Sequence, residues 1–215
     1  MLVTCVTPTA DRREFWARCA RCFLSQDWPE LEWVIVDNGE DPVEDLVPDD
    51  PRARYYRVAG RRTHGALMNE CFERAAGEVC IVHDDDDWYA PDRVSRQARP
   101  FGDPGALVSG TSSLIYVRLG TMEAYRYVNL TGMPWMGAIA VRRVAWEDVK
   151  FSDRKAGADF AWLQRVQRAA WRDLRDDTLL VSTIHGGNAS PKRLPSPAFR
   201  PEPWDTVERI TKGTL

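Results

Sequence analysis

Short apolar runs alternate with longer amphipathic stretches over the first 90 residues of the chain. Four runs rich in β-branched residues and bounded by turn-forming residues predict buried strands. They span residues 2–7, 31–36, 54–58 and 79–83. Residues 11–25 predict a helix that opens with the capping-box spacing of Asp11 and Glu14. Residues 64–76 repeat apolar side chains with a helical period. This alternating order predicts a mainly parallel α/β sheet with right-handed crossovers.

The second half of the chain predicts shorter elements. In chain order they are a strand, a hairpin, a strand, a helix and a strand, at residues 106–109, 113–128, 138–141, 159–171 and 178–184. Five Pro lie between residues 191 and 203, too many for regular structure. We therefore expect residues 191–215 to form a Pro-rich C-terminal tail or a lid.

Polar residues follow three of the predicted parallel strands where each strand ends. They are Thr7-Pro8-Thr9, Asp37-Asn38-Gly39 and Asp84-Asp85-Asp86-Asp87. Open parallel sheets bind ligands at the carboxyl ends of their strands, so we expect one site there. Adjacent carboxylates raise one another's pKa, and a hard divalent cation relieves that repulsion. The alternative is a solvated acidic turn before the helix that Pro91 begins. The buried strand before the turn and Trp88-Tyr89 after it favour a site.

Composition narrows the class of protein. The chain has 215 residues, 44% hydrophobic and 28% charged, with a net charge of -3. These values suit one compact domain and exclude a large basic surface for nucleic acid. The chain has no run of eighteen apolar residues and no signal-peptide pattern, so we expect a soluble, cytoplasmic protein. Cys19 and Cys22 lack the second pair or His of a zinc site. We expect all five Cys to be buried reduced thiols.

Six short motifs occur in order along residues 2–190. They are Val6 to Thr9, Trp33 to Gly39, Gly65 to Asn69 followed by Ala76-Gly77-Glu78, Asp84 to Asp87 with Pro91, Gly157-Ala158-Asp159, and His185 to Ser190. Together they resemble the nucleotide-sugar glycosyltransferases of the GT-A fold, in particular the inverting family two. The resemblance implies a Rossmann-like α/β fold with helices on both faces of the sheet and a small β-hairpin in the acceptor half. One catalytic domain would cover 1–190, with a nucleotide-binding half at 1–90 and an acceptor half at 91–190.

The resemblance also implies residue roles. The residues implied to bind the nucleoside diphosphate sugar donor are Thr7, Pro8, Thr9, Asp37, Arg62, Asn69, Asp84 and Asp85. Asp86 would hold Mn²⁺ (or Mg²⁺) at the two phosphates, with His185 completing the coordination, and imidazole favours Mn²⁺. Asp159 matches the catalytic base. Trp88 and Trp135 are candidates for acceptor binding.

Simpler structural roles are possible for some of these residues, and at two positions the sequence differs from the family pattern. The simpler roles are a helix N-cap for Asp159, a loop histidine bound to backbone for His185, and core or cleft walls for the two Trp residues. Asn38 stands where a second Asp is common in the family, and Ala158 stands where an acidic residue is common. Only Asp159 of that later motif is therefore carried over.

The expected function is metal-dependent transfer, with inversion, of a sugar from a nucleoside diphosphate sugar, expected to be a UDP-sugar, to an acceptor hydroxyl. The acceptor class stays open among a glycan, a lipid-linked sugar, a small molecule, a protein and a modified nucleobase. One alternative is a nucleotidyltransferase, which usually has a glycine-rich loop after the first strand that residues 8–13 do not supply. The other is a catalytically inactive nucleotide- or sugar-binding module.

Overall fold

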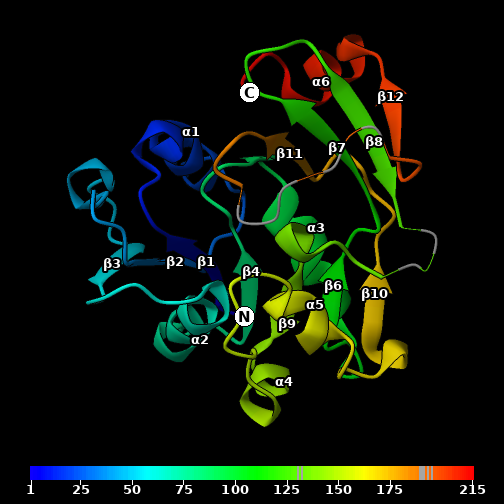
Figure 1. Ribbon diagram of the computed structural model, residues 1–215. Coiled ribbons are helices and arrows are strands. Elements are labelled where there is room, and N and C mark those ends of the chain that lie inside the picture. The colour runs from blue at the N-terminus through cyan, green and yellow to red at the C-terminus, as the bar shows by residue number, and fades with distance from the viewer. Residues whose placement is uncertain (130, 132, 189–191, 193, 195) are drawn as a thin grey trace.

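Two β-sheets form the frame of the protein (Figure 1). The computed structural model describes residues 1–129, 131, 133–188, 192, 194 and 196–215. The larger sheet has seven strands in the order β10-β6-β9-β4-β1-β2-β3. They are β1 (Val3–Thr9), β2 (Leu31–Asp37), β3 (Ala53–Arg57), β4 (Val79–Val82), β6 (Val108–Gly110), β9 (Ala140–Arg142) and β10 (Trp171–Asp173). Strands β1 to β4 are parallel, and β9 runs antiparallel to both its neighbours.

Helices cover both faces of the larger sheet, in agreement with the predicted fold. The helices are α1 (Arg13–Leu24), α2 (His64–Arg74), α3 (Arg93–Ala98), α4 (Arg143–Asp148), α5 (Ala158–Leu163) and α6 (Trp204–Thr211). Side chains alternate between the faces of a strand. Val3 and Cys5 of β1 therefore pack with α1 and α3, while Val6 packs with α2, α4 and α5 on the other face. This double burial explains the nearly continuous apolar runs of these strands.

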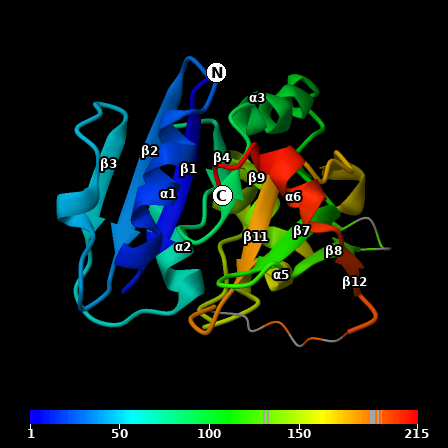
Figure 2. The ribbon, with the colours of Figure 1, turned by 90° about the horizontal axis from the view of Figure 1, so that it is seen from above.

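The second sheet has five strands in the order β12-β8-β7-β11-β5 and lies beside the larger sheet (Figure 2). They are β5 (Trp88–Tyr89), β7 (Ser113–Arg118), β8 (Ala124–Val128), β11 (Leu180–Ile184) and β12 (Phe199–Glu202). Strands β7 and β8 form the predicted hairpin. Short 3-10 helices connect elements at Glu44–Leu46, Arg99–Gly102, Met136–Ala138 and Arg168–Ala170. Val207 of α6 lies in the core of this sheet.

Three predicted local structures were wrong. The helix expected at 159–171 ends at Leu163; a 3-10 helix follows at Arg168–Ala170, and Trp171 begins β10, whose pairing with β6 requires extended backbone. The tail is partly regular, since β12 pairs with β8 and α6 follows. Asp11 does not cap α1: it has a φ of 57°, and its carboxylate accepts the backbone N–H groups of residues 40 and 41. Residues 189–191, 193 and 195 of the expected motif and tail lie outside the described residues.

Two further expectations concern the whole chain. All five Cys are free and buried, as expected of structural thiols. Among the described residues, no helix combines the length and the hydropathy that crossing a bilayer requires.

Candidate active site

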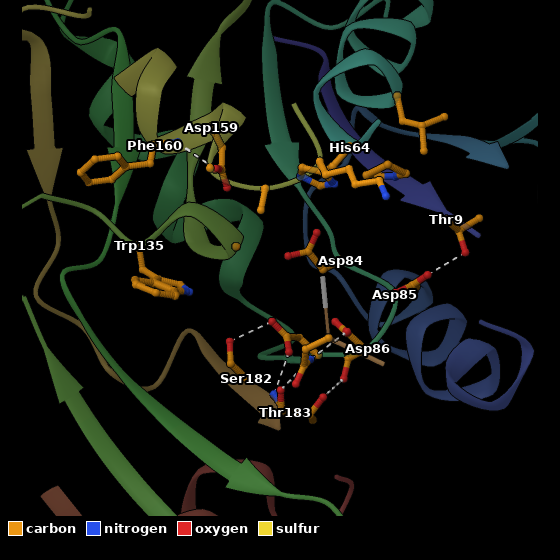
Figure 3. Close-up of a pocket in the computed structure, with 18 of the residues that line it drawn as sticks. Thr9, His64, Asp84, Asp85, Asp86, Trp135, Asp159, Phe160, Ser182 and Thr183 are labelled. Atoms are coloured by element: carbon orange, nitrogen blue, oxygen red, sulfur yellow. Dashed lines mark hydrogen bonds between the residues drawn. The ribbon is translucent and has the colours of Figure 1, made fainter. Parts of the chain in front are cut away.

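A cleft of about 590 Å³ opens at the carboxyl ends of β1, β2 and β4. The first half of the chain supplies one side of this cleft through Pro8, Thr9, Asn38 and the turn at Asp84–Asp87. The second half supplies the other side, from the residues around Trp135 and Asp159 (Figure 3). The polar strand ends therefore meet where the sequence predicts a site.

The turn at Asp84–Asp87, called the acid turn below, joins the two sheets. The carboxylate of Asp87 accepts hydrogen bonds from the hydroxyl of Ser182 and the backbone N–H of Thr183, each at 2.8 Å. The hydroxyl of Thr183 donates to the carbonyl oxygen of Asp86 at 2.7 Å. Strand β11 thus holds the last two residues of the acid turn, Asp86 through its carbonyl oxygen and Asp87 through its carboxylate.

The first strand and α1 hold the other side of the acid turn. The hydroxyl of Thr9 donates to Asp85 at 2.6 Å, and Arg18 of α1 donates to the carbonyl oxygen of Asp86 at 2.6 Å. Because β4 ends at Val82, these residues form a turn rather than a strand. The alternation of a strand therefore does not turn Asp85 away, and all four carboxylates line the cleft.

Gly137 allows this dense packing of carboxylates. A Cβ atom at Gly137 would lie 2.9 Å from Oδ2 of Asp84 and 3.6 Å from Oδ2 of Asp87. A larger residue would require the Asp84 carboxylate to shift. The glycine is therefore part of how the sequence holds two carboxylates against the short helix at 136–138.

Burial and mutual repulsion set the protonation of the acid turn. Burial, reinforced by the charge of Asp86, raises the pKa of Asp84, Asp85 and Asp87 above the ordinary range. Burial also acts on Asp86, but hydrogen bonds from His185 and Arg12 outweigh it and lower the pKa of that carboxyl. Asp86 is thus the carboxyl of the acid turn whose pKa is lowered, and Arg12 and His185 are the partners that lower it.

Asp86 and His185 are adjacent although 99 residues separate them, with Oδ2 and Nε2 2.9 Å apart. The backbone N–H of Gly187 donates to Nδ1 of His185, and the ring packs on Phe15 at 4.5 Å, so Nε2 points at the carboxylate. Asn188 supports this arrangement by accepting the backbone N–H of His185 at 2.8 Å.

While Nδ1 of His185 accepts from Gly187, Nε2 carries the ring proton and donates it to Asp86. After loss of that proton from Nε2, the two side chains would fit a divalent metal ion as neighbouring ligands. An octahedral ion with bonds of about 2.1 Å places adjacent ligand atoms about 3.0 Å apart, close to the observed 2.9 Å. An oxygen and an imidazole nitrogen suit Mn²⁺. Within the described part of the chain, no group of three or more His, Cys, Asp or Glu side chains is arranged to hold a metal. The pair alone could supply only part of a coordination sphere.

The end of the cleft near β2 is lined by Asn38, Arg61 and Arg62. Asp37 lies behind them with no exposed surface. Its carboxylate accepts from the backbone N–H of Gly39 at 2.8 Å and from the hydroxyl of Tyr55 at 2.9 Å. In this structure Asp37 shapes the loop after β2, while Asn38 meets the cleft.

Asp159 lies on the opposite side of the cleft, one residue into α5. Gly157, with a φ of 71°, is the N-cap, and the carboxylate of Asp159 accepts only the N–H of Phe160 at 2.7 Å among the described residues. Figure 3 shows Asp159 and Asp84 pointing into the same space from opposite sides.

Gly65 brings this side of the cleft close to the sheet. A Cβ atom at Gly65 would lie 2.0 Å from the carbonyl oxygen of Ser152 and 2.9 Å from Cβ of Ala158. Helix α2 can therefore contact the loop before α5 only with glycine here. The same contact places His64, the first residue of α2, in the cleft lining.

Aromatic rings line the cleft beyond Asp159. Trp135 packs edge-on against Tyr127, with ring centroids 4.9 Å apart, and against Tyr116 at 5.9 Å. The ammonium of Lys192 lies 4.9 Å from the Trp135 ring centroid, a cation–π distance. This part of the cleft offers flat apolar faces beside one positive charge.

Several residues predicted for the site do not line the cleft. Thr7 donates to the carbonyl oxygen of His83 at 2.6 Å, inside the sheet. Asn69 donates to the carbonyl oxygen of Phe151 at 2.9 Å. Trp88 is 4% exposed and donates to Thr214, so it is a core residue here. His185 and Asp37 stand directly behind lining residues. The other predicted residues line the cleft: Pro8, Thr9, Arg62, Asp84, Asp85, Asp86, Trp135 and Asp159.

Sequence reasoning missed other residues of the cleft. Arg12, Asn38, Asp87, Asn188 and Lys192 line it without having been assigned a role. Three of these residues, Asp87, Asn38 and Asn188, lie inside the predicted motifs. The motifs therefore indicate the right segments, although the roles were assigned to neighbouring residues. Arg12 and Lys192 had no such signal, because nothing local tells a charge in a cleft from one in solvent.

Comparison with known proteins identifies the family of the chain. Residues 4–144 match the sequence model of the family described as Glycosyl transferase family 2. The chain belongs to this family. Its members are inverting glycosyltransferases. The match includes β1, the acid turn and Trp135, and it ends before Asp159.

Individual relatives are more distant. The chain is 30% identical over 99 residues to the putative colanic acid biosynthesis glycosyl transferase WcaA of Escherichia coli (strain K12), which covers 44% of this chain and 36% of WcaA. It therefore spans little more than a third of that relative.

Two solved structures have a similar fold. S. aureus TarS 1-349 in complex with UDP has a TM-score of 0.66 at 17% identity, covering 86% of this chain and 61% of TarS 1-349. The mannosyltransferase PcManGT from Pyrobaculum calidifontis, in complex with GDP-Man and Mn²⁺, also has a TM-score of 0.66 at 17% identity, covering 89% and 58%. The predicted GT-A fold is confirmed.

Proposed function

We propose that this protein transfers a sugar from a nucleoside diphosphate sugar to an acceptor hydroxyl, with inversion and with a divalent metal ion. The observation that carries the proposal is the position of Asp159 opposite the acid turn in one cleft (Figure 3). A base on one side and a diphosphate site on the other are what an in-line displacement at a sugar carbon requires.

The donor proposed is a UDP-sugar. Asn38 lines the end of the cleft near β2, next to Asp37, which the resemblance implies to bind the base or the ribose of the donor. A side-chain amide can accept the N3–H of uracil through its oxygen and donate to a neighbouring carbonyl through its nitrogen. Guanine instead presents two adjacent donors, which an aspartate accepts better than an asparagine. TarS was solved with UDP and PcManGT with GDP-Man, so these structures do not agree on a base. The assignment of uracil is therefore argued from Asn38 alone.

Asp86 and His185 would hold the metal ion. When bound, a Mn²⁺ or Mg²⁺ ion stabilises the negative charge of the departing nucleoside diphosphate. Thr9 and the other three carboxylates of the acid turn would fix the ribose and the phosphates relative to Asp86. The leaving group then needs no general acid, so a single protein carboxylate is enough for the transfer.

Asp159 would act as the base. It would accept the proton of the acceptor hydroxyl as that oxygen forms a bond to the anomeric carbon and the bond to the phosphate oxygen breaks. Its half-buried carboxylate has only the neighbouring N–H of Phe160 as a partner among the described residues, which leaves one oxygen available. The rings around Trp135 offer a flat surface for an acceptor, whose class stays open.

Nucleotide binding and product analysis test this proposal. UDP, GDP, ADP and CDP are compared by thermal shift with and without Mn²⁺, and UDP with Mn²⁺ should give the largest stabilisation. Slow hydrolysis of a UDP-sugar should release UDP. Preference for another base overturns the uridine assignment alone. In a separate assay with UTP and a sugar 1-phosphate, release of pyrophosphate would indicate a nucleotidyltransferase. Nucleotide binding without turnover in either assay would indicate an inactive module.

A further inference from the structure

Arg12 occupies the gap between the two proposed metal ligands. Its Nη1 lies 2.7 Å from Oδ2 of Asp86 and 3.4 Å from Nε2 of His185. Its Nη2 donates to the carbonyl oxygen of Gly187 at 2.6 Å. The Arg12 side chain is only 17% exposed, although it stands at the start of a helix that faces solvent. The guanidinium therefore joins the acid turn to the turn that carries His185.

Local structure does not explain this position. Arg12 is the N-cap residue of α1, and its side chain makes no capping hydrogen bond. Phe15, one turn along the helix, lies 5.7 Å from the guanidinium carbon and 4.5 Å from the His185 ring. The same ring thus orients both groups toward Asp86. The helix presents the arginine to the carboxylate rather than to its own backbone.

The arginine and a metal ion need the same atoms. Oδ2 of Asp86 already accepts from Arg12 at 2.7 Å, and a metal ion bound to that oxygen and to Nε2 would meet a positive charge within a few ångströms. Two cations at that separation repel strongly in a site this buried. Arg12 must therefore move before a metal ion can bind the pair.

We infer that Arg12 is a resident cation that competes with the metal ion for Asp86 and His185, so that tight metal binding requires the nucleoside diphosphate to arrive with it. This inference rests on the proposed function. A diphosphate brings negative charge into the cleft, and a guanidinium pairs with phosphate oxygens in a fork. Arg12 lines the cleft, so rotation of its side chain alone can exchange Asp86 for a phosphate.

The exchange makes metal and nucleotide binding interdependent. Each ligand raises the affinity for the other by the same factor, as linkage requires. Arg12 is a positioning residue in this scheme. It keeps the Asp86–His185 pair assembled without metal and delays metal binding until the substrate is present. A purely structural salt bridge would stabilise the fold and would not couple the two ligands.

The test measures Mn²⁺ binding to the full chain by electron paramagnetic resonance, without nucleotide. Arg12→Met should bind Mn²⁺ at least about tenfold more tightly than wild type, because the competing charge is gone. Arg13→Met is the matched control: it removes the same charge from the next residue, which pairs with Asp45 at 2.6 Å outside the cleft, and should leave the affinity unchanged. Arg12→Lys should give an intermediate affinity.

A second titration at saturating UDP measures the coupling. UDP should raise the Mn²⁺ affinity of wild type and of Arg13→Met by a larger factor than that of Arg12→Met. Equal or weaker Mn²⁺ binding by both Arg12 variants, with wild-type coupling to UDP, overturns the inference and leaves the proposed function intact. If Mn²⁺ binds no variant even with UDP, the proposed metal dependence fails as well. Circular dichroism checks that each variant is folded. If Arg12→Met does not fold, Arg12→Lys replaces it in both titrations.

Discussion

The two sides of the cleft are built differently. On the donor side the carboxylates of the acid turn have fixed partners: Thr9 holds Asp85, and Ser182 with Thr183 holds Asp87, all buried. On the acceptor side Asp159 meets only the N–H of the next residue within the described part of the chain, and residues 153–156 before it are exposed. The donor carboxylates are therefore held by several partners, whereas the Asp159 carboxylate is held only by its own helix. We call these the rigid side and the loosely held side, after their carboxylates.

This difference follows from what each side is attached to. The donor side sits on the ends of parallel strands that are buried on both faces, so its backbone is fixed by the core. The acceptor side sits on a loop, and loops can change without loss of the fold.

The largest effect is expected on the loosely held side. Asp159→Asn should lower transfer by about 10²- to 10⁴-fold, the range for loss of a general base, and keep donor and metal affinity within a few-fold. The amide retains the size of the side chain and the acceptance of the Phe160 N–H. Acceptor turnover and donor titration are measured on the same variant. Near-normal turnover would leave Asp159 a structural residue of α5.

The next effect tests the rigid side. Asp86→Ala should weaken metal-dependent donor binding by more than about a hundredfold, since removing a ligand costs more than removing a supporting residue. Asp85→Ala should weaken it less, because Asp85 bonds Thr9 and its nearest oxygen lies 3.9 Å from Nη1 of Arg12. Calorimetric titration of UDP with and without Mn²⁺ separates the two. Equivalent losses would mean that the turn acts as one unit.

Substitution of two Trp residues should have different effects, one mainly on acceptor binding and the other on the stability of the fold. Trp135→Ala should raise the acceptor KM roughly tenfold through lost stacking and should lower the unfolding free energy less than Trp88→Ala does, because Trp135 is only partly buried. Trp88→Ala should lower the unfolding free energy by about 3–5 kcal/mol, as expected for a buried aromatic ring, and leave the KM of the remaining folded enzyme unchanged. Steady-state kinetics and urea unfolding measure both. The reverse assignment would place the acceptor on the other ring.

The smallest effect probes how the two sides are joined. Gly65→Ala should lower the unfolding free energy by about 1–3 kcal/mol, because its Cβ would overlap the carbonyl oxygen of Ser152. Gly102→Ala is the control, since nothing lies within 4 Å of a Cβ there. Transfer should fall with the first substitution only, as Asp159 shifts away from the donor. Equal stability of both variants would show that the loop before α5 yields without cost.

The sequence predicted the rigid side well because its signals are local. Strand β2 was expected at 31–36 and spans Leu31–Asp37, since a strand buried on both faces is a continuous apolar run. The acid turn was predicted as a site because four adjacent charges after such a strand are costly to bury without a cation. Both arguments use neighbouring residues only.

Predictions failed where distant residues decide the structure. Trp171 has the period of a helix, but pairing with β6 draws it into β10. Arg12 meets Asp86 across 74 residues and His185 across 173, and no local pattern carries such contacts. Asp11 caps the loop at 40–41 instead of its own helix for the same reason. The acceptor side depends mostly on contacts of this kind.

The acid turn leads from β4 directly into β5, and β5 pairs with β11 in the other sheet. The acid turn thus connects the two sheets through the backbone. The N–H of Thr183, which donates to Asp87, reports on whether β11 stays bound to this turn. Hydrogen exchange at that amide should slow when donor binds, although the amide belongs to the second sheet. A chain cut after residue 90 would separate β4 from β9 and β5 from β11, so neither half should keep its structure alone.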